Sequence, residues 1–103
     1  MVPFPYSDRL AEKRRPALVV STARLEEELG RVWVAMITTD RGGRQHGDSS
    51  ITDLAAAGLP VRSIVRASKL ATIEVERVIR KAGGLAAPDA ESAAAALRIC
   101  AAF

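Results

Sequence analysis

Hydrophobic residues along the chain form runs of strand length in the first two thirds and take helical spacing near the end. Residues 16–21 (PALVVS) are a continuous apolar run, which predicts a central strand buried on both faces. Residues 31–39 (RVWVAMITT) are rich in β-branched side chains, and residues 63–70 (SIVRASKL) alternate apolar and polar positions. The prolines of residues 1–6 (MVPFPY) remove backbone donors, so this segment is predicted as a short extended segment at a sheet edge or at the start of a strand.

Helical patterns occur in three further segments. Residues 22–30 (TARLEEELG) are predicted as a helix with Thr22 as N-cap and Gly30 at its end. Residues 87–103 give the clearest helix, because Pro88 suits the first helical position and Asp89 favours the positive end of the helix dipole. In residues 72–83, side chains such as Ile73, Glu76 and Arg80 recur at i,i+3 and i,i+4 spacing, which favours a helix. The spacing is weak, so a turn followed by a short strand is the alternative.

Polar and glycine-rich segments separate these elements. Residues 7–15 (SDRLAEKRR) are predicted as a polar loop and residues 40–50 as a Gly- and Ser-rich loop. Residues 51–63 continue with turn signals at Gly58 and Pro60. Short strands followed by one terminal helix predict a mainly β fold, a small bent antiparallel barrel or sandwich packed by that helix. We expect residues 1–103 to form a single domain.

Composition adds three expectations. Only four of the 103 residues are aromatic, so part of the stability is expected to come from a partner subunit. Cys100 stands alone in an Ala-rich stretch, where a buried small hydrophobe is the favoured interpretation. No apolar run reaches the roughly 18 residues of a membrane span, and no signal-peptide pattern begins the chain, which predicts a cytoplasmic protein without membrane contact.

Positive charge is in mild excess, with 15 Lys and Arg against 12 Asp and Glu. The cations fall into three groups: Arg9, Lys13, Arg14 and Arg15; Arg41 and Arg44; and Arg62, Arg66 and Lys69. If the fold brings these groups to one face, that face attracts phosphate. Composition alone gives equal weight to scattered solubilising charges.

Several enzyme classes find no support in the sequence. It contains no GxGxxG, GxxxxGK[ST], HExxH or GxSxG motif, and its single histidine cannot build a multi-histidine metal site. We therefore expect neither metal nor cofactor. A hydrolytic reaction here would use a substrate whose own group is the nucleophile.

Five segments together resemble one protein family. They are residues 2–8 (VPFPYSD), 13–21 (KRRPALVVS), 32–39 (VWVAMITT), 47–66 (GDSSITDLAAAGLPVRSIVR) and 68–74 (SKLATIE). In this order and spacing they are similar to the PemK/MazF-like toxins of bacterial type II toxin-antitoxin systems. The resemblance covers about residues 2–85. It differs from the family at the start of the chain, where a short segment before VPFP is missing and the first strand is expected to be shortened.

The resemblance implies an SH3-like barrel with a C-terminal helix, a homodimer, and metal-independent cleavage of single-stranded RNA. It also implies a cognate antitoxin that places its C-terminal segment over the RNA groove. In this family, catalysis is carried by the Arg of an Arg-Pro pair and by the first Thr at the end of the next long strand. The resemblance implies that the corresponding residues here are Arg15 and Thr38. The expected RNA-binding residues are Lys13, Arg14, Arg41, Arg44, His46, Arg66, Ser68 and Lys69.

The general base is left open by the sequence. Some family members carry an Arg-x-Asp element whose Asp is a proposed base, but here it reads Arg66-Ala-Ser68. His46 is one alternative because its unperturbed pKa is near neutrality, although a bystander or RNA contact is the favoured interpretation. Asp48 is a second alternative, although Asp after Gly usually forms a turn.

Three functions follow as hypotheses. The first is a sequence-selective RNA-cleaving toxin, the second an inactive SH3-like module that binds RNA or an antitoxin, and the third a gyrase-directed toxin of the same architecture. The presence of both Arg15 and Thr38 favours the first.

Overall fold

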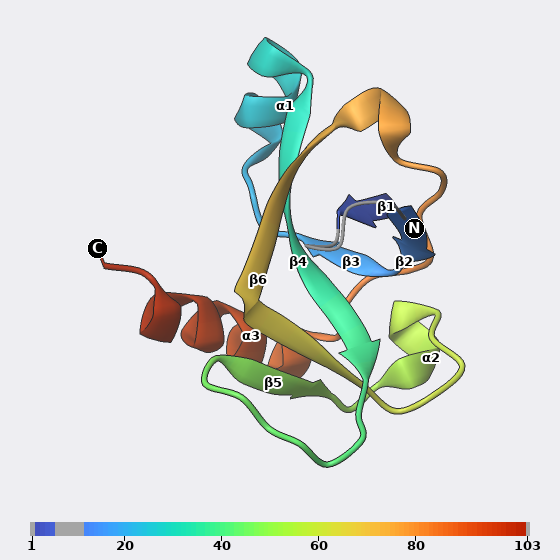
Figure 1. Cartoon of the computed structure of the whole chain (residues 1–103), viewed down its shortest axis with the longest axis vertical. Helices are drawn as coiled ribbons and strands as arrows, with labels where there is room; N and C mark the ends of the chain where they lie inside the picture. Colours follow the sequence, from blue (N-terminus) through green and yellow to red (C-terminus); the bar gives the residue numbers. More distant parts are fainter. Residues whose placement is uncertain (1, 6–11, 103) are drawn as a thin grey trace.

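The computed structural model describes residues 2–5 and 12–102, with the backbone alone for residues 2–5 and 12–14. Strands dominate the first three quarters of the chain and one long helix follows (Figure 1). The elements are β1 (Val2–Pro5), β2 (Glu12–Arg15), β3 (Ala17–Val19), α1 (Ala23–Leu29), β4 (Arg31–Thr39), β5 (Asp48–Ile51), α2 (Leu54–Ala57), β6 (Ser63–Glu74), the 3₁₀ turn η1 (Val75–Arg77) and α3 (Ala87–Cys100).

Four strands form one antiparallel sheet in the order β3-β4-β6-β5, and β1 pairs with β2 in a separate hairpin. The β4–β6 register shifts in the middle: Ala35 lies opposite Leu70, but the next residue, Met36, lies opposite Arg66. The three residues of β6 between these partners form an irregularity, and such bulges bend a strand and increase its twist. The long strand β6 therefore turns sharply, which curves the sheet into a half-barrel (Figure 1).

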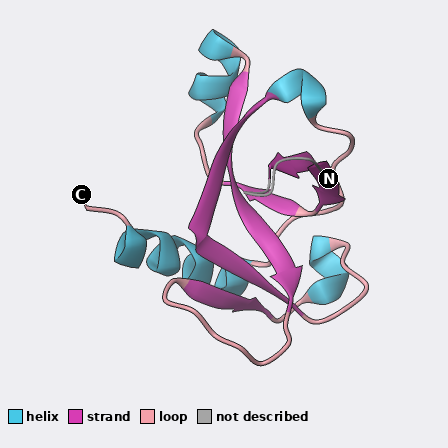
Figure 2. Cartoon of the chain, in the orientation of Figure 1, coloured by secondary structure: helices cyan, strands magenta, loops and turns pink. Residues whose placement is uncertain are grey.

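The curved sheet buries apolar side chains in two clusters. Val32, Val34, Met36 and Ile73 form the first of these. The second joins the lower sheet to two helices: Ala35, Ile37, Ile51, Ala57, Val65 and Ala93. Because Ala93 belongs to α3, this helix covers one side of the sheet, next to β5 and β6 (Figure 2). The expected mainly β fold with a C-terminal helix is confirmed.

The helices end where capping chemistry predicts. The side chain of Thr22 accepts a hydrogen bond from the backbone N–H of Leu25, and Gly30 ends α1 with φ of 65°. In α3, Pro88 lies in the first turn. The helices predicted for residues 22–30 and 87–103 are confirmed. In the described part of the chain, no helix has the length and apolar character needed to cross a membrane.

Two predictions about the N-terminal region are wrong. Residues 17–19 form an edge strand of the four-stranded sheet and are only partly buried, because β4 and β6 occupy the centre. Val19 is 52% exposed. Residues 12–15, predicted as loop, pair with β1, with Arg15 opposite Val2. Residues 7–11, the rest of the predicted loop, lie outside the described part of the chain.

Three predictions about the second half are also wrong. The segment 72–83 contains no α-helix: β6 continues to Glu74, since Ile73 pairs with Val32 of β4, and only the single turn η1 follows. The predicted loops between residues 40 and 63 contain β5 and the short helix α2. Cys100 is exposed at the end of α3, because that helix faces the sheet with its alanines.

Candidate active site

A cavity of about 290 Å³ lies where β2, the end of β4 and the α2–β6 loop meet. Its described lining includes Arg15 and Thr38. The other lining residues are Pro16, Ile37, Thr39, Gly58, Leu59, Pro60, Val61, Ser63, Arg80 and Ala82. We call this cavity the Arg15–Thr38 pocket. The structure thus brings together the two residues that the sequence singled out for catalysis.

Local geometry explains why these residues meet. Arg15 is the last residue of β2, and Pro16 forces an extended backbone onto it. The backbone N–H of Ile37 donates to the carbonyl oxygen of Pro16 at 3.2 Å, which fixes the chain after Arg15 against the end of β4. Thr38 follows directly on that strand. Arg15 and Thr38 are both partly buried, so their side chains form part of the pocket wall and do not extend from a solvated loop.

The pocket combines one type of charge with hydroxyls and apolar walls. Arg15 and Arg80 bring guanidinium groups, which stay cationic and offer paired N–H donors that match phosphate oxygens. Hydroxyl groups come from Thr38, Thr39 and Ser63. Among the described residues that line this pocket there is no carboxylate and no imidazole. Such a site can bind an anion and stabilise negative charge that grows on it.

Arg66 has a different environment. Its Nε and Nη2 donate to the two carboxylate oxygens of Asp48, each at 3.0 Å, in a paired geometry. The Asp48 side chain is 1% exposed and that of Arg66 17% exposed. The hydrogen bonds from Arg66 hold the pKa of Asp48 below its ordinary value despite burial, and the carboxylate in turn raises the pKa of Arg66. The structure therefore gives no support to Asp48 as general base, because its carboxylate is buried and bound to Arg66, and its lowered pKa makes it a weak base.

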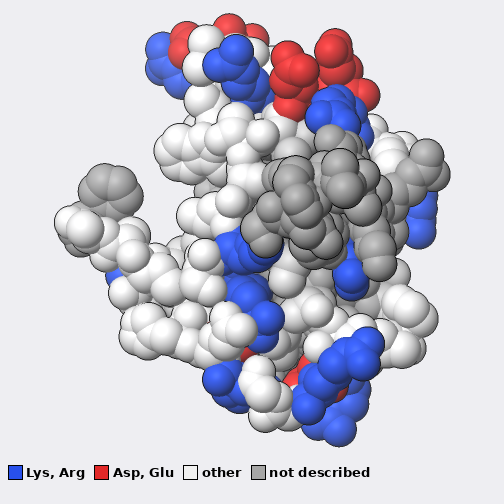
Figure 3. All heavy atoms as spheres, in the orientation of Figure 1, with Lys and Arg blue, Asp and Glu red and all other residues white. Residues whose placement is uncertain are grey.

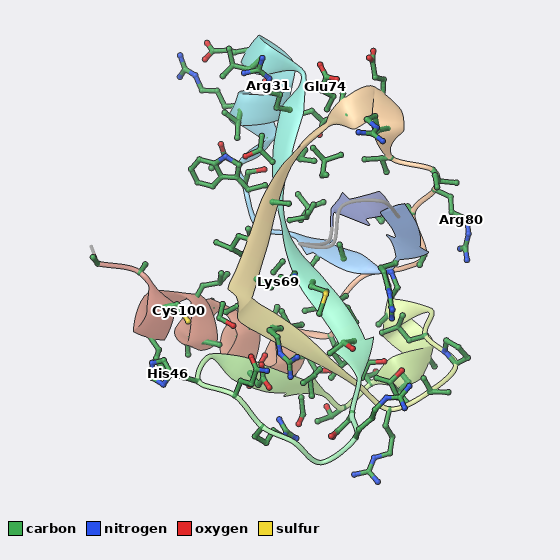
Figure 4. All side chains as sticks on the ribbon, in the orientation of Figure 1. Arg31, His46, Lys69, Glu74, Arg80 and Cys100 are labelled. Carbon is green, nitrogen blue, oxygen red and sulfur yellow. The ribbon has the colours of Figure 1, made fainter. Side chains whose placement is uncertain are left out.

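Arg44 is also paired, though nearer to solvent. Its Nη2 donates to Asp40 Oδ2 at 3.3 Å and to the hydroxyl of Ser50 at 2.6 Å. The exposed Arg41 lies on the same β4–β5 loop. His46 is exposed near the far end of α3, beside Cys100 (Figure 4), and does not line the Arg15–Thr38 pocket. The structure therefore gives no support to His46 as a base.

The remaining predicted RNA contacts lie on or near the bend of β6. Ser68 is exposed and Lys69 partly buried, and neither lines the Arg15–Thr38 pocket. Lys69 lies near the centre of the face shown in Figure 4. Figure 3 shows Lys and Arg side chains gathered over the lower half of this face. The backbone of Lys13 and Arg14 belongs to β2, but their side chains lie outside the described part.

Sequence reasoning missed two residues. Arg80 lines the Arg15–Thr38 pocket. The sequence pattern placed it only in the helix predicted for residues 72–83 and indicated no role in the site. Asp89 is 3% exposed and accepts hydrogen bonds from the backbone N–H of Asp53 at 2.9 Å and the hydroxyl of Thr52 at 2.7 Å. These bonds hold the pKa of Asp89 below its ordinary value. Nothing in the local sequence signals this link between α3 and the start of α2.

No metal centre forms among the residues that the structure describes, since no three His, Cys, Asp or Glu side chains come together. The lining of the Arg15–Thr38 pocket consists of cations, hydroxyls and apolar groups, which are poor partners for a metal ion. The pocket is thus better suited to a phosphate than to a cation.

Comparisons with known proteins identify the family and the fold. The family model described as PemK-like, MazF-like toxin of type II toxin-antitoxin system matches residues 1–101. The solved Mycobacterium tuberculosis toxin MazF-mt6 is 26% identical with a TM-score of 0.69, over 93% of this chain and 90% of that one. A structure named Mtb toxin is 30% identical with a TM-score of 0.69, over 82% of this chain and 89% of that one.

A MazE-MazF structure from Deinococcus radiodurans, 20% identical, shares the fold with a TM-score of 0.66 over 94% of this chain and 92% of that one. No curated protein matches the chain. The family match extends over nearly the whole sequence, and it includes both Arg15 and Thr38. The chain therefore belongs to the PemK-like, MazF-like toxins of type II toxin-antitoxin systems.

Proposed function

We propose that this toxin cleaves single-stranded RNA without a metal ion, with the ribose 2′-OH as nucleophile. The observation that carries the proposal is that Arg15 and Thr38 line one pocket, together with Arg80 and the hydroxyl groups of Thr39 and Ser63. Among the similar structures, one of 18% identity is named an endoribonuclease in complex with its cognate antitoxin. That likeness concerns the fold, and the chemistry is argued from the pocket.

In the proposed reaction, the 2′-oxygen attacks the adjacent phosphorus and the bond from phosphorus to the 5′-oxygen breaks. The 2′-OH loses its proton and the leaving 5′-oxygen gains one, so the products are a 2′,3′-cyclic phosphate and a 5′-OH. The attacking group belongs to the substrate, so the protein's task is alignment and charge stabilisation.

Each pocket residue has a role in that task. The guanidinium of Arg15 binds the two non-bridging phosphate oxygens and neutralises the charge that grows on them. The Thr38 hydroxyl donates a further hydrogen bond to the phosphate from a rigid strand end. We assign no side chain as general base, because the two candidates raised by the sequence, His46 and Asp48, lie outside the pocket lining.

We further propose that residues 1–103 are one toxin domain that forms a homodimer, binds a cognate antitoxin and acts in the cytoplasm. The surface that supports a dimer is apolar: Trp33 is 52% and Leu70 54% exposed, and both line one hollow of about 360 Å³ on β4 and β6. Exposed apolar surface of this kind favours association. Light scattering at micromolar concentration should give twice the chain mass.

The test of the activity is incubation of purified protein with long single-stranded RNA in EDTA, followed by mapping of new ends. We expect cleavage with 5′-OH ends. Intact RNA across several unrelated sequences, from a protein with a cooperative melting transition, would instead favour a module that binds RNA or antitoxin without cutting. Cleavage that requires added Mg²⁺ would contradict the mechanism.

A further inference from the structure

The segment that follows η1 has no regular secondary structure, yet it packs tightly against α2. The backbone N–H of Gly84 donates to the carbonyl oxygen of Ala56 at 3.0 Å. A Cβ atom added at Gly83 would overlap the backbone of Ala56 and Ala57. Main chain therefore lies directly on main chain at this point.

A second glycine completes the contact from the opposite side. Gly58 ends α2 with φ of 70°, in the left-handed region that favours glycine. A Cβ atom added there would overlap the carbonyl group of Ala82. We call the packing of Gly58 and Gly83 the glycine contact. It holds residues 82–84 against the end of α2, which itself forms one wall of the Arg15–Thr38 pocket.

Arg80 lies three residues before Gly83, at the start of the segment that this contact holds. Arg80 lines the Arg15–Thr38 pocket and also an adjoining, mainly apolar cavity of about 420 Å³. Its side chain is exposed, on the coil after η1, on the same side of the molecule as β2 and α2 (Figure 4). The neighbouring cations differ: Lys81 lines only the apolar cavity, and Arg77 lines neither.

We propose that Arg80 is a substrate-binding residue that holds an RNA phosphate next to the scissile one, and that the glycine contact presents it to the Arg15–Thr38 pocket. This inference rests on the proposed function, because it takes RNA as the occupant of the pocket. An arginine is suited to the role because its planar fork binds phosphate oxygens in pairs. Arg15, partly buried at a strand end, serves the scissile phosphate, and Arg80, exposed at the rim, serves binding.

The different roles proposed for Arg15 and Arg80 predict different kinetic effects. Binding that is equal in ground and transition states changes KM and leaves kcat unaltered. Arg80→Ala should therefore raise KM about tenfold and change kcat by less than about threefold. The KM of Arg80→Lys should lie between those of wild type and Arg80→Ala, because lysine keeps the positive charge but lacks the paired N–H donors of arginine. Arg77→Ala, the matched control, should stay within about twofold of wild type because Arg77 lies outside both cavities.

Binding can be measured apart from cleavage with a labelled single-stranded oligonucleotide that carries 2′-O-methyl groups throughout. For Arg80→Ala we expect weaker binding and a slope of log Kd against log salt lower by about 0.7, the value for one phosphate contact on a single strand. Equal binding, equal KM and equal slope for Arg80→Ala and Arg77→Ala would overturn the inference. If wild type binds this probe through Arg80 but cuts no RNA, the proposed cleavage fails and the assignment of Arg80 stands.

Adjacent glycines test the second half of the proposal. Gly83→Ala places a methyl group against α2, whereas Gly84→Ala meets nothing within 4 Å. In protein that is shown to be folded by its melting transition, Gly83→Ala should raise KM as Arg80→Ala does, and Gly84→Ala should behave as wild type. If Gly83→Ala lowers the melting temperature and leaves KM unchanged, the glycine contact stabilises the fold but does not position Arg80.

Discussion

Two groups of arginines that look alike in the sequence have different surroundings in the structure. Arg15 and Arg80 line the Arg15–Thr38 pocket together with the hydroxyl groups of Thr38, Thr39 and Ser63. Arg66 and Arg44, on the β5 side of the sheet, are paired with Asp48 and Asp40. A local positive charge therefore does not by itself identify an RNA-binding residue; the place of the side chain in the fold, at a pocket or in a buried ion pair, distinguishes the two groups.

The two ion pairs also differ from each other. The Asp48 side chain is 1% exposed, so its carboxylate has lost nearly all contact with water and depends on Arg66. The Arg44 side chain is 47% exposed and its pair with Asp40 is close to solvent. Buried pairs are costly to break because the remaining charge is left without compensation, whereas exposed pairs contribute little. The Arg66–Asp48 pair thus contributes to the stability of the fold.

The largest expected effect is on catalysis at the pocket. Arg15→Ala should lower the cleavage rate at saturating RNA by about 10²-fold or more, the usual loss for one preorganised donor. The melting temperature should change little, because the guanidinium is not part of either core cluster. Single-turnover cleavage and a thermal melt measure the two quantities.

Lys13→Ala is the matched control, since it removes the same charge from the same strand. It should weaken RNA binding and leave the rate at saturation close to wild type. Thr38→Val, nearly isosteric, should slow cleavage less than Arg15→Ala does. Equal saturated rates for Arg15→Ala and Lys13→Ala would show that β2 only attracts RNA and that Arg15 is not catalytic.

A large effect on stability is expected on the other side of the comparison. Arg66→Ala leaves the buried Asp48 carboxylate without its cation and should lower the free energy of unfolding by about 2–4 kcal/mol. Arg44→Ala should cost only about 0–1 kcal/mol because its pair is exposed. Urea titration of both variants provides the measurement. Similar losses for the two variants would mean that burial does not distinguish the pairs.

The same carboxylates predict how stability depends on pH. The pKa values of Asp48 and Asp89 lie below their ordinary values in the folded protein, because of hydrogen bonds from Arg66 and from residues 52 and 53. Unfolded carboxyl groups of Asp titrate near about 3.9, so this stabilisation is complete above that pH and is lost as the pH falls toward the folded values. The melting temperature should fall mainly below about pH 4, and less steeply in Arg66→Ala. An equal acid slope in both proteins would exclude Asp48 as a source of the effect.

The smallest effect is expected at the β4–β5 loop. Arg41 is exposed and lies outside the Arg15–Thr38 pocket, so Arg41→Ala should weaken RNA binding slightly and lower the salt slope by at most about 0.7. The cleavage rate at saturating RNA should not change. A slower saturated rate would extend the catalytic region beyond the pocket.

Much of the fold could be predicted where local chemistry decides the structure. The first helix has a capping Thr22 and a terminal Gly30, and β4 is a run of β-branched and apolar residues, so both were found with their bounds nearly correct. The last four residues of β6, 71–74, were missed because their weak helical spacing is outweighed by pairing with β4, a contact across more than 30 residues that no short window contains. The apolar run at residues 17–19 suggested a central strand, but an edge strand can also bury an apolar side chain: Leu18 packs with the cluster that contains Ala93 of α3.

The candidate site was predictable only in part, and for the same reason. Arg15 and Thr38 are 23 positions apart, and their association came from the family resemblance rather than from any local pattern. Asp48 and Arg66 are 18 positions apart on paired strands. Their ion pair could therefore not be recognised from the sequence, and both residues were assigned other roles. Arg80 lines the pocket from the coil after η1, a position that no charge pattern in the sequence signals.

The central claim is that the substrate's own 2′-OH is the nucleophile in the Arg15–Thr38 pocket, and one substitution in the RNA tests it. Once a cut has been mapped, an oligonucleotide with a single deoxyribose on the 5′ side of the cut is compared with its all-ribose counterpart in EDTA. The account predicts equal binding, no cleavage of the deoxy substrate, and a 2′,3′-cyclic phosphate on the normal product. Cleavage of the deoxy substrate at the same bond, or products with 5′-phosphate and 3′-OH ends, would contradict it.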